Sequence, residues 1–178
     1  MINDGLNPLE LNTTTALTNV SSMFSGCQAF NQKVLFGNMQ NVTTIESMFN
    51  GCSIFNNGRM INDGFNPLEF NTSSELITCL NMFYGCTLFN QYINIQDTSG
   101  VITLESMFNG CSVFNNGSTS NDGLNPLEWI TSSALTNEAY MFYNCVSFNQ
   151  QVNFSDITGV TNNTGMFEGC TIYNGGVV

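Results

Sequence analysis

The sequence predicts an α/β solenoid, a stack of six coils that each contain a short strand, a turn and a short helix. A Met-Phe pair recurs along the whole chain, apolar residues two apart precede it at a fixed distance, and apolar residues three and four apart surround it. The pairs begin at Met23, Met48, Met82, Met107, Met141 and Met166. Subtracting neighbouring numbers gives 25, 34, 25, 34 and 25, and two successive intervals add up to 59 residues. A fixed period of this size is typical of solenoids and repeat arrays.

The domain organisation follows from this period. The 178 residues hold three 59-residue units with one residue over. We expect a single solenoid domain over residues 1–178, made of double repeats at 1–59, 60–118 and 119–178.

The strand of each coil is predicted from two apolar residues that flank one variable residue. The second of them lies twelve residues before the Met, at Leu11, Phe36, Phe70, Ile95, Trp129 and Phe154. The first lies two residues earlier, at Leu9, Val34, Leu68, Ile93, Leu127 and Val152. This alternation is typical of a short strand with one face on a core.

A short helix is predicted around each Met. An apolar residue lies six residues before it in every copy and three residues before it in the first four copies, and a Cys lies four residues after it; these steps fit one stripe of a helix. The residue before the Cys is Gly26, Gly51, Gly85, Gly110, Asn144 or Gly169. Because glycine and asparagine enter the left-handed region most easily, this position predicts a helix C-cap. Thr43 with Glu46 and Thr72 with Glu75 have the spacing of a capping box at the other end.

A Phe-Asn pair, Tyr-Asn in the last copy, closes each coil. Its asparagines are Asn31, Asn56, Asn90, Asn115, Asn149 and Asn174. An asparagine at one place in every coil can bond backbone groups of its own and the next coil, so we expect an asparagine ladder. The alternative is that these amides bind sugars.

The repeated string resembles a known family. "NVTTIESMFNGCSIFN" and its five relatives are similar to the 25-residue repeat of the BspA-like leucine-rich-repeat surface proteins, which include mycoplasma lipoproteins. The resemblance implies a leucine-rich-repeat-type solenoid and a role in surface display or adhesion. It favours an extracellular location or the surface of a cell or virion. The 34-residue spacing of every second interval departs from the simple family repeat.

The nine extra residues of the long intervals predict extruded loops. They read "NNGRMINDG" at 56–64 and "NNGSTSNDG" at 115–123, each framed by Asn-Gly and Asp-Gly turn signals. Insertions of this kind gather on one face of a solenoid, often the binding face. The variable middles are the candidate interaction residues: Arg59, Met60, Ile61, Ser118, Thr119 and Ser120.

Cysteine usage indicates a structural column. The chain has no His, which excludes Ser-His and Cys-His nucleophile pairs and ordinary zinc sites. Six of the seven cysteines hold one repeat position: Cys27, Cys52, Cys86, Cys111, Cys145 and Cys170. Stacked coils would space them about 4.8 Å apart. We expect seven buried, reduced cysteines, because a disulfide between stacked coils would distort the stack.

Recurring carboxylates raise the alternative of calcium. Asp4, Asp63 and Asp122 recur in "NDGLNPLE" or "NDGFNPLE". Each is joined by Glu10, Glu69 or Glu128. Successive copies should lie about 10 Å apart, too far for one ion to bridge. We expect plain Asp-Gly turns, with calcium as the weaker alternative.

Composition narrows the function classes. The net charge of -11 argues against nucleic acid as a partner, because phosphates would be repelled. No apolar run approaches the roughly 18 residues of a membrane span. We expect a structural or interaction protein that is not an enzyme, needs no cofactor and assembles head to tail with copies of itself. The alternative to this assembly is that the residues are a window of a longer array, in which the same junction is covalent. The alternative is a ligand-binding or adhesion module that uses the loops to bind a protein or glycan, with calcium as an aid.

Overall fold

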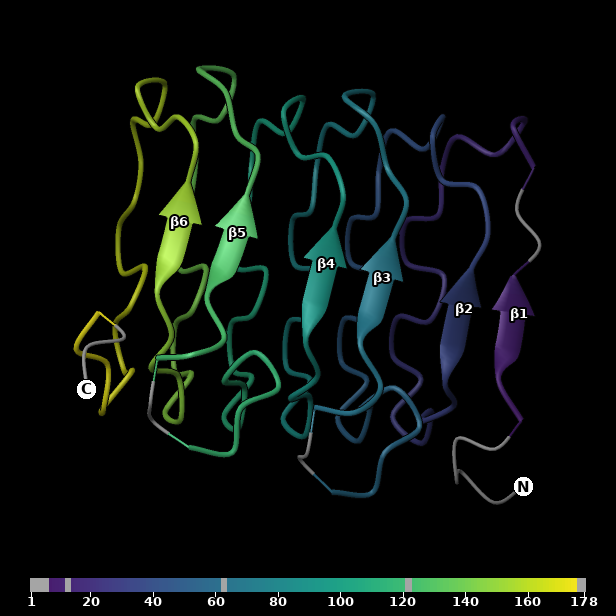
Figure 1. Cartoon of the computed structure of the whole chain (residues 1–178), viewed down its shortest axis with the longest axis horizontal. Helices are drawn as coiled ribbons and strands as arrows, with labels where there is room; N and C mark the ends of the chain where they lie inside the picture. Colours follow the sequence, from purple (N-terminus) through teal and green to yellow (C-terminus); the bar gives the residue numbers. More distant parts are fainter. Residues whose placement is uncertain (1–6, 12–13, 62–63, 121–122, 176–178) are drawn as a thin grey trace.

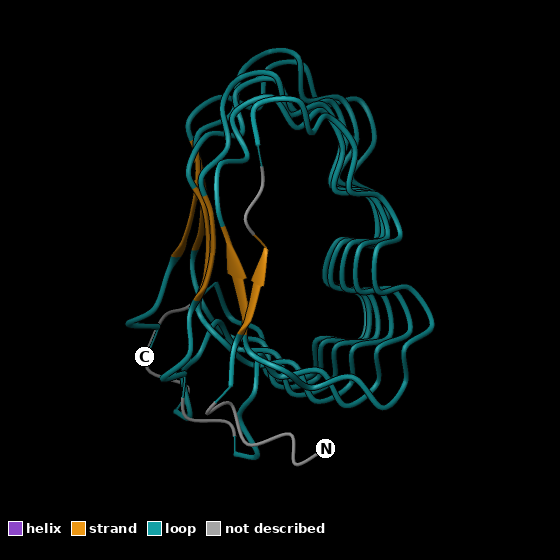
Figure 2. Ribbon diagram, turned by 90° about the vertical axis from the view of Figure 1, so that its right-hand side faces the viewer, coloured by secondary structure: helices purple, strands orange, loops and turns teal. Residues whose placement is uncertain are grey.

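The computed structural model describes residues 7–11, 14–61, 64–120 and 123–175 as a solenoid of repeated coils. Figure 1 shows the strands side by side and pointing the same way, and Figure 2, viewed along the stack, shows the coils superposed as a ring. The strands are β1 (Leu9–Leu11), β2 (Val34–Phe36), β3 (Leu68–Phe70), β4 (Ile93–Ile95), β5 (Leu127–Trp129) and β6 (Val152–Phe154). They lie at the predicted positions, and each begins one of coils 1 to 6.

The described residues contain no helix, so the predicted short helices and the α/β class are wrong. Around each Met the backbone forms consecutive turns in which an N–H bonds the carbonyl three residues before it. In coil 2, Met48 N bonds Ile45 O at 3.3 Å, and Asn50 N bonds Ser47 O at 3.1 Å. The N–H groups between these turns face the neighbouring coil instead of continuing a helix. Consecutive turns produce the same three-residue apolar spacing as a helix, which explains the error.

The left-handed conformation predicted before each Cys is confirmed, but the predicted helix C-cap is wrong because the described residues contain no helix. The residue before each Cys has a positive φ, for example 77° at Gly110 and 59° at Asn144. It is the third residue of a turn closed by the Cys N–H, a position that requires positive φ in a type II turn. The residue before each Met also has positive φ, although it is Ser, Asn or Tyr in five copies and Gly in one; the six are Ser22, Ser47, Asn81, Ser106, Tyr140 and Gly165.

The two predicted capping boxes are wrong because there is no helix to cap. The Thr43 hydroxyl donates to Thr18 O of coil 1 at 3.1 Å, and the Thr72 hydroxyl donates to Asp97 O of coil 4 at 3.0 Å. Both threonines therefore connect neighbouring coils.

One side of the ring, which we call the turn wall, is continuous through the stack. It consists of residues 19–26, 44–51, 78–85, 103–110, 137–144 and 162–169. At each of the five junctions, four N–H groups of one coil donate to four carbonyls of the next coil. Between coils 3 and 4 these are Cys79 to Thr103, Asn81 to Glu105, Phe83 to Met107 and Gly85 to Asn109, at 2.8–3.3 Å. All four donors lie in the earlier coil at every junction.

The opposite side, which we call the strand wall, is interrupted. β1 pairs with β2, β3 with β4 and β5 with β6, all in parallel, but β2 does not pair with β3 nor β4 with β5. At the β2 and β3 junction, Val34 N donates to Asn57 Oδ1 at 2.8 Å, and Asn57 Nδ2 donates to Pro67 O at 3.2 Å. One side-chain amide thus replaces the strand pairing. Asn116 bridges Ile93 and Pro126 in the same way at the next interruption.

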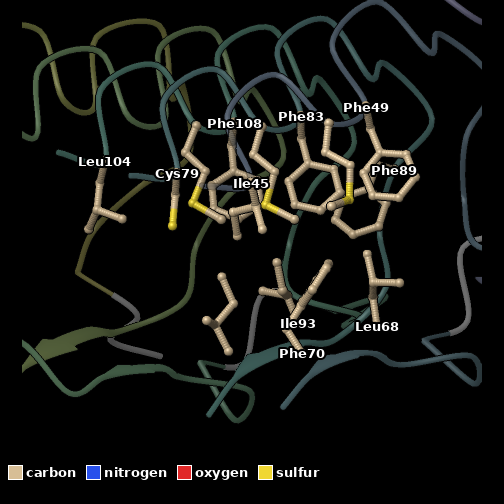
Figure 3. Packing of buried hydrophobic residues seen from close by; sticks show 14 of the residues in the cluster. Ile45, Phe49, Leu68, Phe70, Cys79, Phe83, Phe89, Ile93, Leu104 and Phe108 are labelled. Carbon is tan, nitrogen blue, oxygen red and sulfur yellow. The ribbon is translucent and has the colours of Figure 1, made fainter. Parts of the chain in front are cut away.

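The core fills the ring between the two walls. Figure 3 shows Phe49, Phe83 and Phe108 of the turn wall facing β3 and β4. Their rings stack with centroids 5.4 and 5.5 Å apart and planes within 6°. The rings of Phe36 and Phe70 stack at 4.7 Å, so the core stays closed where β2 and β3 are unpaired.

Candidate functional site

The asparagine ladder holds the extruded loops. Asn31 Oδ1 accepts bonds from the N–H groups of Asn56 at 2.7 Å and Gly58 at 3.0 Å, and Asn31 Nδ2 donates to Arg59 O at 2.9 Å. Asn56 Nδ2 then donates to Ile61 O at 3.1 Å. The first loop is therefore fixed by the side chains of two successive ladder asparagines.

The second loop is held in the same way. Asn90 Oδ1 accepts from Asn115 N at 2.7 Å and Gly117 N at 3.0 Å, while Asn90 Nδ2 donates to Ser118 O at 2.9 Å. Asn115 Nδ2 donates to Ser120 O at 2.9 Å. Asn149 N donates to Asn115 Oδ1, and Asn174 N to Asn149 Oδ1, each at 2.9 Å. Because these amides are engaged in the stack, they are poorly suited to bind sugars.

The variable middles of the loops differ in chemistry. The first loop presents Met60 and Ile61 to solvent, and Arg59 lies over the ring of Phe65 at 5.8 Å. The second loop carries Ser118, Thr119 and Ser120, with Ser118 buried beside the ladder. Two identical frames thus display a cationic and apolar surface in one loop and a hydroxyl surface in the other.

A groove of about 350 Å³ lies beside the second loop. It is lined by Asn90, Val113, Asn115, Ser118, Thr119, Ser147 and Ile172. The groove crosses several coils, so its walls come from residues far apart in the sequence.

The cysteine column exists, but it is not uniformly buried. From coil 2 onward each column thiol donates to a Phe carbonyl of the preceding coil, as Cys52 does to Phe24 O at 2.9 Å and Cys170 to Phe142 O at 3.0 Å. Burial raises the pKa of Cys52 and Cys170 to about 11 and those of Cys86, Cys111 and Cys145 well above the ordinary value. Cys27 is exposed and Cys170 is half-buried, so the expectation of seven buried cysteines is wrong. The thiols point toward the preceding coil, and coil 1 has no described coil on that side. All seven cysteines are free.

The predicted calcium residues Asp4, Asp63 and Asp122 lie outside the described residues. Their partner Glu128 accepts a bond from Asn153 Nδ2 of the adjacent strand at 2.8 Å. Among the described residues, no group of three or more His, Cys, Asp or Glu side chains could hold a metal ion.

Two sets of polar residues escaped sequence reasoning. Asn57 and Asn116 bridge the strand wall. Their repeat position alternates between Gln and Asn, as Gln32, Asn57, Gln91, Asn116 and Gln150, and this alternation could have indicated a separate role for the asparagines. Glu138 is 4% exposed in a core column, and burial raises its pKa. Its Oε1 and the Nε1 of Trp129 are buried without a hydrogen-bond partner among the described residues.

These features define a repeat protein of the solenoid class, built from 59-residue double repeats that share one backbone frame. The chain belongs to the family described as Mycoplasma protein of unknown function, DUF285, which matches residues 3–76 and 59–177. Neither a curated protein nor a solved structure matches the chain. In the described part of the chain, no helix has the length and apolar character to cross a bilayer.

Proposed function

We propose that this chain is a structural and interaction protein without enzymatic activity, a surface-displayed or fibre-forming solenoid that assembles end to end. Its resemblance to the BspA-like leucine-rich-repeat surface proteins supports the extracellular or surface location. One observation supports the assembly: among the described residues, the bonding pattern of the turn wall is open at both ends of the stack.

The open groups at the two ends are complementary. At the coil 1 end, the carbonyls of Asn19, Ser21, Met23 and Ser25 occupy the acceptor positions of the turn wall but accept no backbone bond from another described residue. At the coil 6 end, the N–H groups of Asn163, Gly165, Phe167 and Gly169 occupy the donor positions and donate to no described backbone group. A coil 6 end placed on a coil 1 end repeats the pattern of the five internal junctions.

The side chains at the ends support the same contact. Met23 is 40% exposed, whereas Met48, Met82, Met107 and Met141 at the same repeat position are completely buried. Phe24 and Phe167, the two ends of the ring stack, are only partly buried. Each of the other column thiols donates to a Phe carbonyl of the preceding coil. In an end-to-end contact, the exposed Cys27 thiol would donate to the Phe167 carbonyl of a second copy in the same way. A contact of this kind is heterologous and does not close, so it propagates into a filament.

Light scattering of the purified chain over a wide concentration range tests this proposal. We expect the mass to rise with concentration, and Met23→Asp to abolish the rise because it places a charge on the coil 1 end. Ile102→Asp is the matched control, since Ile102 is similarly exposed, at 45%, but lies on the side of the stack. A monomer at all concentrations, or equal behaviour of both variants, refutes end-to-end assembly.

A second candidate function is a ligand-binding or adhesion module that uses the loops to contact a protein or glycan surface. The rigid hold of the asparagine ladder on two chemically different loops favours it. Calcium would assist only if the Asp-containing ends of the loops bind it. A large fall in melting temperature on adding EDTA would support the calcium-assisted form, and an unchanged melting temperature contradicts it.

A further inference from the structure

We propose that the groove beside the second loop is a binding site for a small uncharged polyhydroxy ligand, of the size and chemistry of a single sugar residue. This inference rests on the second candidate function, the binding role of the loops, and assigns a ligand class to one of them. It does not depend on end-to-end assembly.

The lining of the groove excludes charged ligands. None of the seven described residues that line it is ionisable, so a charged group entering it would lose hydration without gaining an ion pair from them. The chain has only 2 basic residues, and its net charge of -11 adds a further barrier to anions. A cation would find no carboxylate among the described residues of the lining.

The same lining fits a molecule that carries hydroxyl groups on an apolar carbon frame. Thr119 and Ser147 offer hydroxyls, each of which can donate one hydrogen bond and accept others, whereas the buried Ser118 hydroxyl already donates to Ser120 O at 2.8 Å. Val113 and Ile172 supply aliphatic surface for the C–H face of the ligand. The volume of about 350 Å³ is near the lower end of the range for small-molecule sites, which favours one ring over a longer chain.

The groove is formed before any ligand arrives. The bonds from Asn90 to Ser118 O and from Asn115 to Ser120 O hold the loop wall against the ladder. Gly117 fixes the base of the loop: a Cβ there would lie 2.9 Å from Tyr92 N and 3.2 Å from Gly64 Cα of the first loop. A rigid wall reduces the ordering cost of binding.

The first double repeat supplies an internal comparison. The residues that lie 59 positions before Ser118, Thr119 and Ser147, and hold the equivalent places in the first loop and coil 3, are Arg59, Met60 and Leu88. The backbone frame is the same, but larger and partly charged side chains stand where the groove has hydroxyls. The ligand class we propose is therefore specific to the second loop.

The experiment uses the full chain with methyl glucoside, methyl galactoside and N-acetylglucosamine as neutral probes. Saturation-transfer NMR detects binding and calorimetry measures affinity. Ser147→Leu introduces the residue of the equivalent position in coil 3 and should weaken binding at least about tenfold, equivalent to about 1.4 kcal/mol. Thr136→Ile is the matched control, because Ile77 holds its equivalent position outside the groove. It should bind like the unmodified chain, and thermal unfolding checks that both variants are folded.

A sugar phosphate serves as the charged probe and should bind at least about tenfold more weakly than its neutral parent. The inference is overturned if no neutral probe binds at millimolar concentration, if the phosphate binds better, or if Ser147→Leu binds as well as the control. These outcomes do not affect end-to-end assembly, which light scattering reads separately. The second candidate function is tested separately by exchanging residues 59–61 with residues 118–120. If this exchange alters binding to a larger protein or glycan surface, the loops have a binding role even when the sugar inference fails.

Discussion

The turn wall and the strand wall belong to the same six coils, yet only the turn wall is continuous. In the turn wall, four backbone bonds join every pair of neighbouring coils, whatever the length of the intervening chain. In the strand wall, pairing occurs across the 25-residue intervals and fails across the 34-residue intervals. The loops leave and enter the coil directly before the strand, so their insertion disturbs the strand wall alone.

The difference shows how a repeat protein can accept insertions without losing its stack. The turn wall keeps all six coils in register. Where nine extra residues separate two strands in the strand wall, the side-chain amide of one asparagine bonds both strand segments in place of backbone pairing. Pro67 and Pro126 precede β3 and β5, where a missing N–H is tolerated because the strand has no backbone partner on that side.

Removing a stacked ring should produce the largest effect. Phe89→Ala removes a completely buried ring that stacks on Phe83 at 4.4 Å, and we expect a loss of about 3–5 kcal/mol in the free energy of unfolding. Glu69→Gln on the exposed face of β3 should change it by less than about 0.5 kcal/mol. Denaturant titration measures both, and equal losses would contradict the assignment of the core.

Removing a bridging amide tests the strand wall directly. Asn116→Ala leaves Ile93 N–H and Pro126 O without their partner, and we expect a loss of about 2–3 kcal/mol in the free energy of unfolding. Asn94→Ala, on the exposed face of β4, is the control and should be nearly neutral. If the two variants are equally stable, the amide does not replace the missing pairing.

Glu138 is the one carboxylate among the buried residues that the structure describes, and we expect it to make the coil 5 and 6 junction sensitive to pH. Burial raises its pKa in the folded state, so the folded state favours the protonated form. Its contribution to stability is therefore fully present below the unfolded pKa and is lost as the pH rises through the folded pKa. Glu138→Leu, which introduces the residue found at Leu104, should raise the free energy of unfolding at neutral pH by about 1–2 kcal/mol. Thermal unfolding at several pH values checks this: a variant that keeps the pH dependence of the unmodified chain would exclude Glu138 as its source.

The smallest effect concerns the left-handed position of the turn wall. A Cβ at Gly110 would have its nearest neighbour at 3.7 Å, so Gly110→Ala meets no clash and should cost only the strain of a positive φ, about 1 kcal/mol. Asn144→Gly in the next coil should be neutral or slightly stabilising by chemical denaturation. A loss several times larger for Gly110→Ala would mean that coil 4 cannot accept a side chain at this position, although coil 5 carries Asn144 there.

The sequence was informative where one residue type has one physical role. Alternating apolar residues located all six strands, and Gly or Asn before the Cys located a left-handed residue. The Asn-Gly signals placed the start of both loops, whereas the aspartates of the Asp-Gly signals lie outside the described residues. These features depend on local geometry or on burial of one face, which a repeat shows several times over.

The errors arose where different structures produce the same pattern. Inward residues three apart occur both in a helix and in consecutive turns. The two structures differ in whether the backbone N–H groups of Ser47 and Phe49 donate to carbonyls of their own coil or of the next coil. The role of Asn57 depended on the absence of pairing between β2 and β3, which no local signal shows. The exposure of Cys27 depended on its position in the stack, since its repeat position is the same as that of buried Cys52.

The one-way bonding of the turn wall gives the solenoid an electrical direction. In each coil, four peptide units have their carbonyls toward the coil 1 end and their N–H groups toward the coil 6 end. Peptide dipoles of about 3.5 D that are aligned in this way add up, as they do along an α-helix. The coil 6 end is therefore the positive pole, where the carboxylate of Glu168 lies, and the coil 1 end is the negative pole. Every coil added to such a stack lengthens the dipole without reversing it.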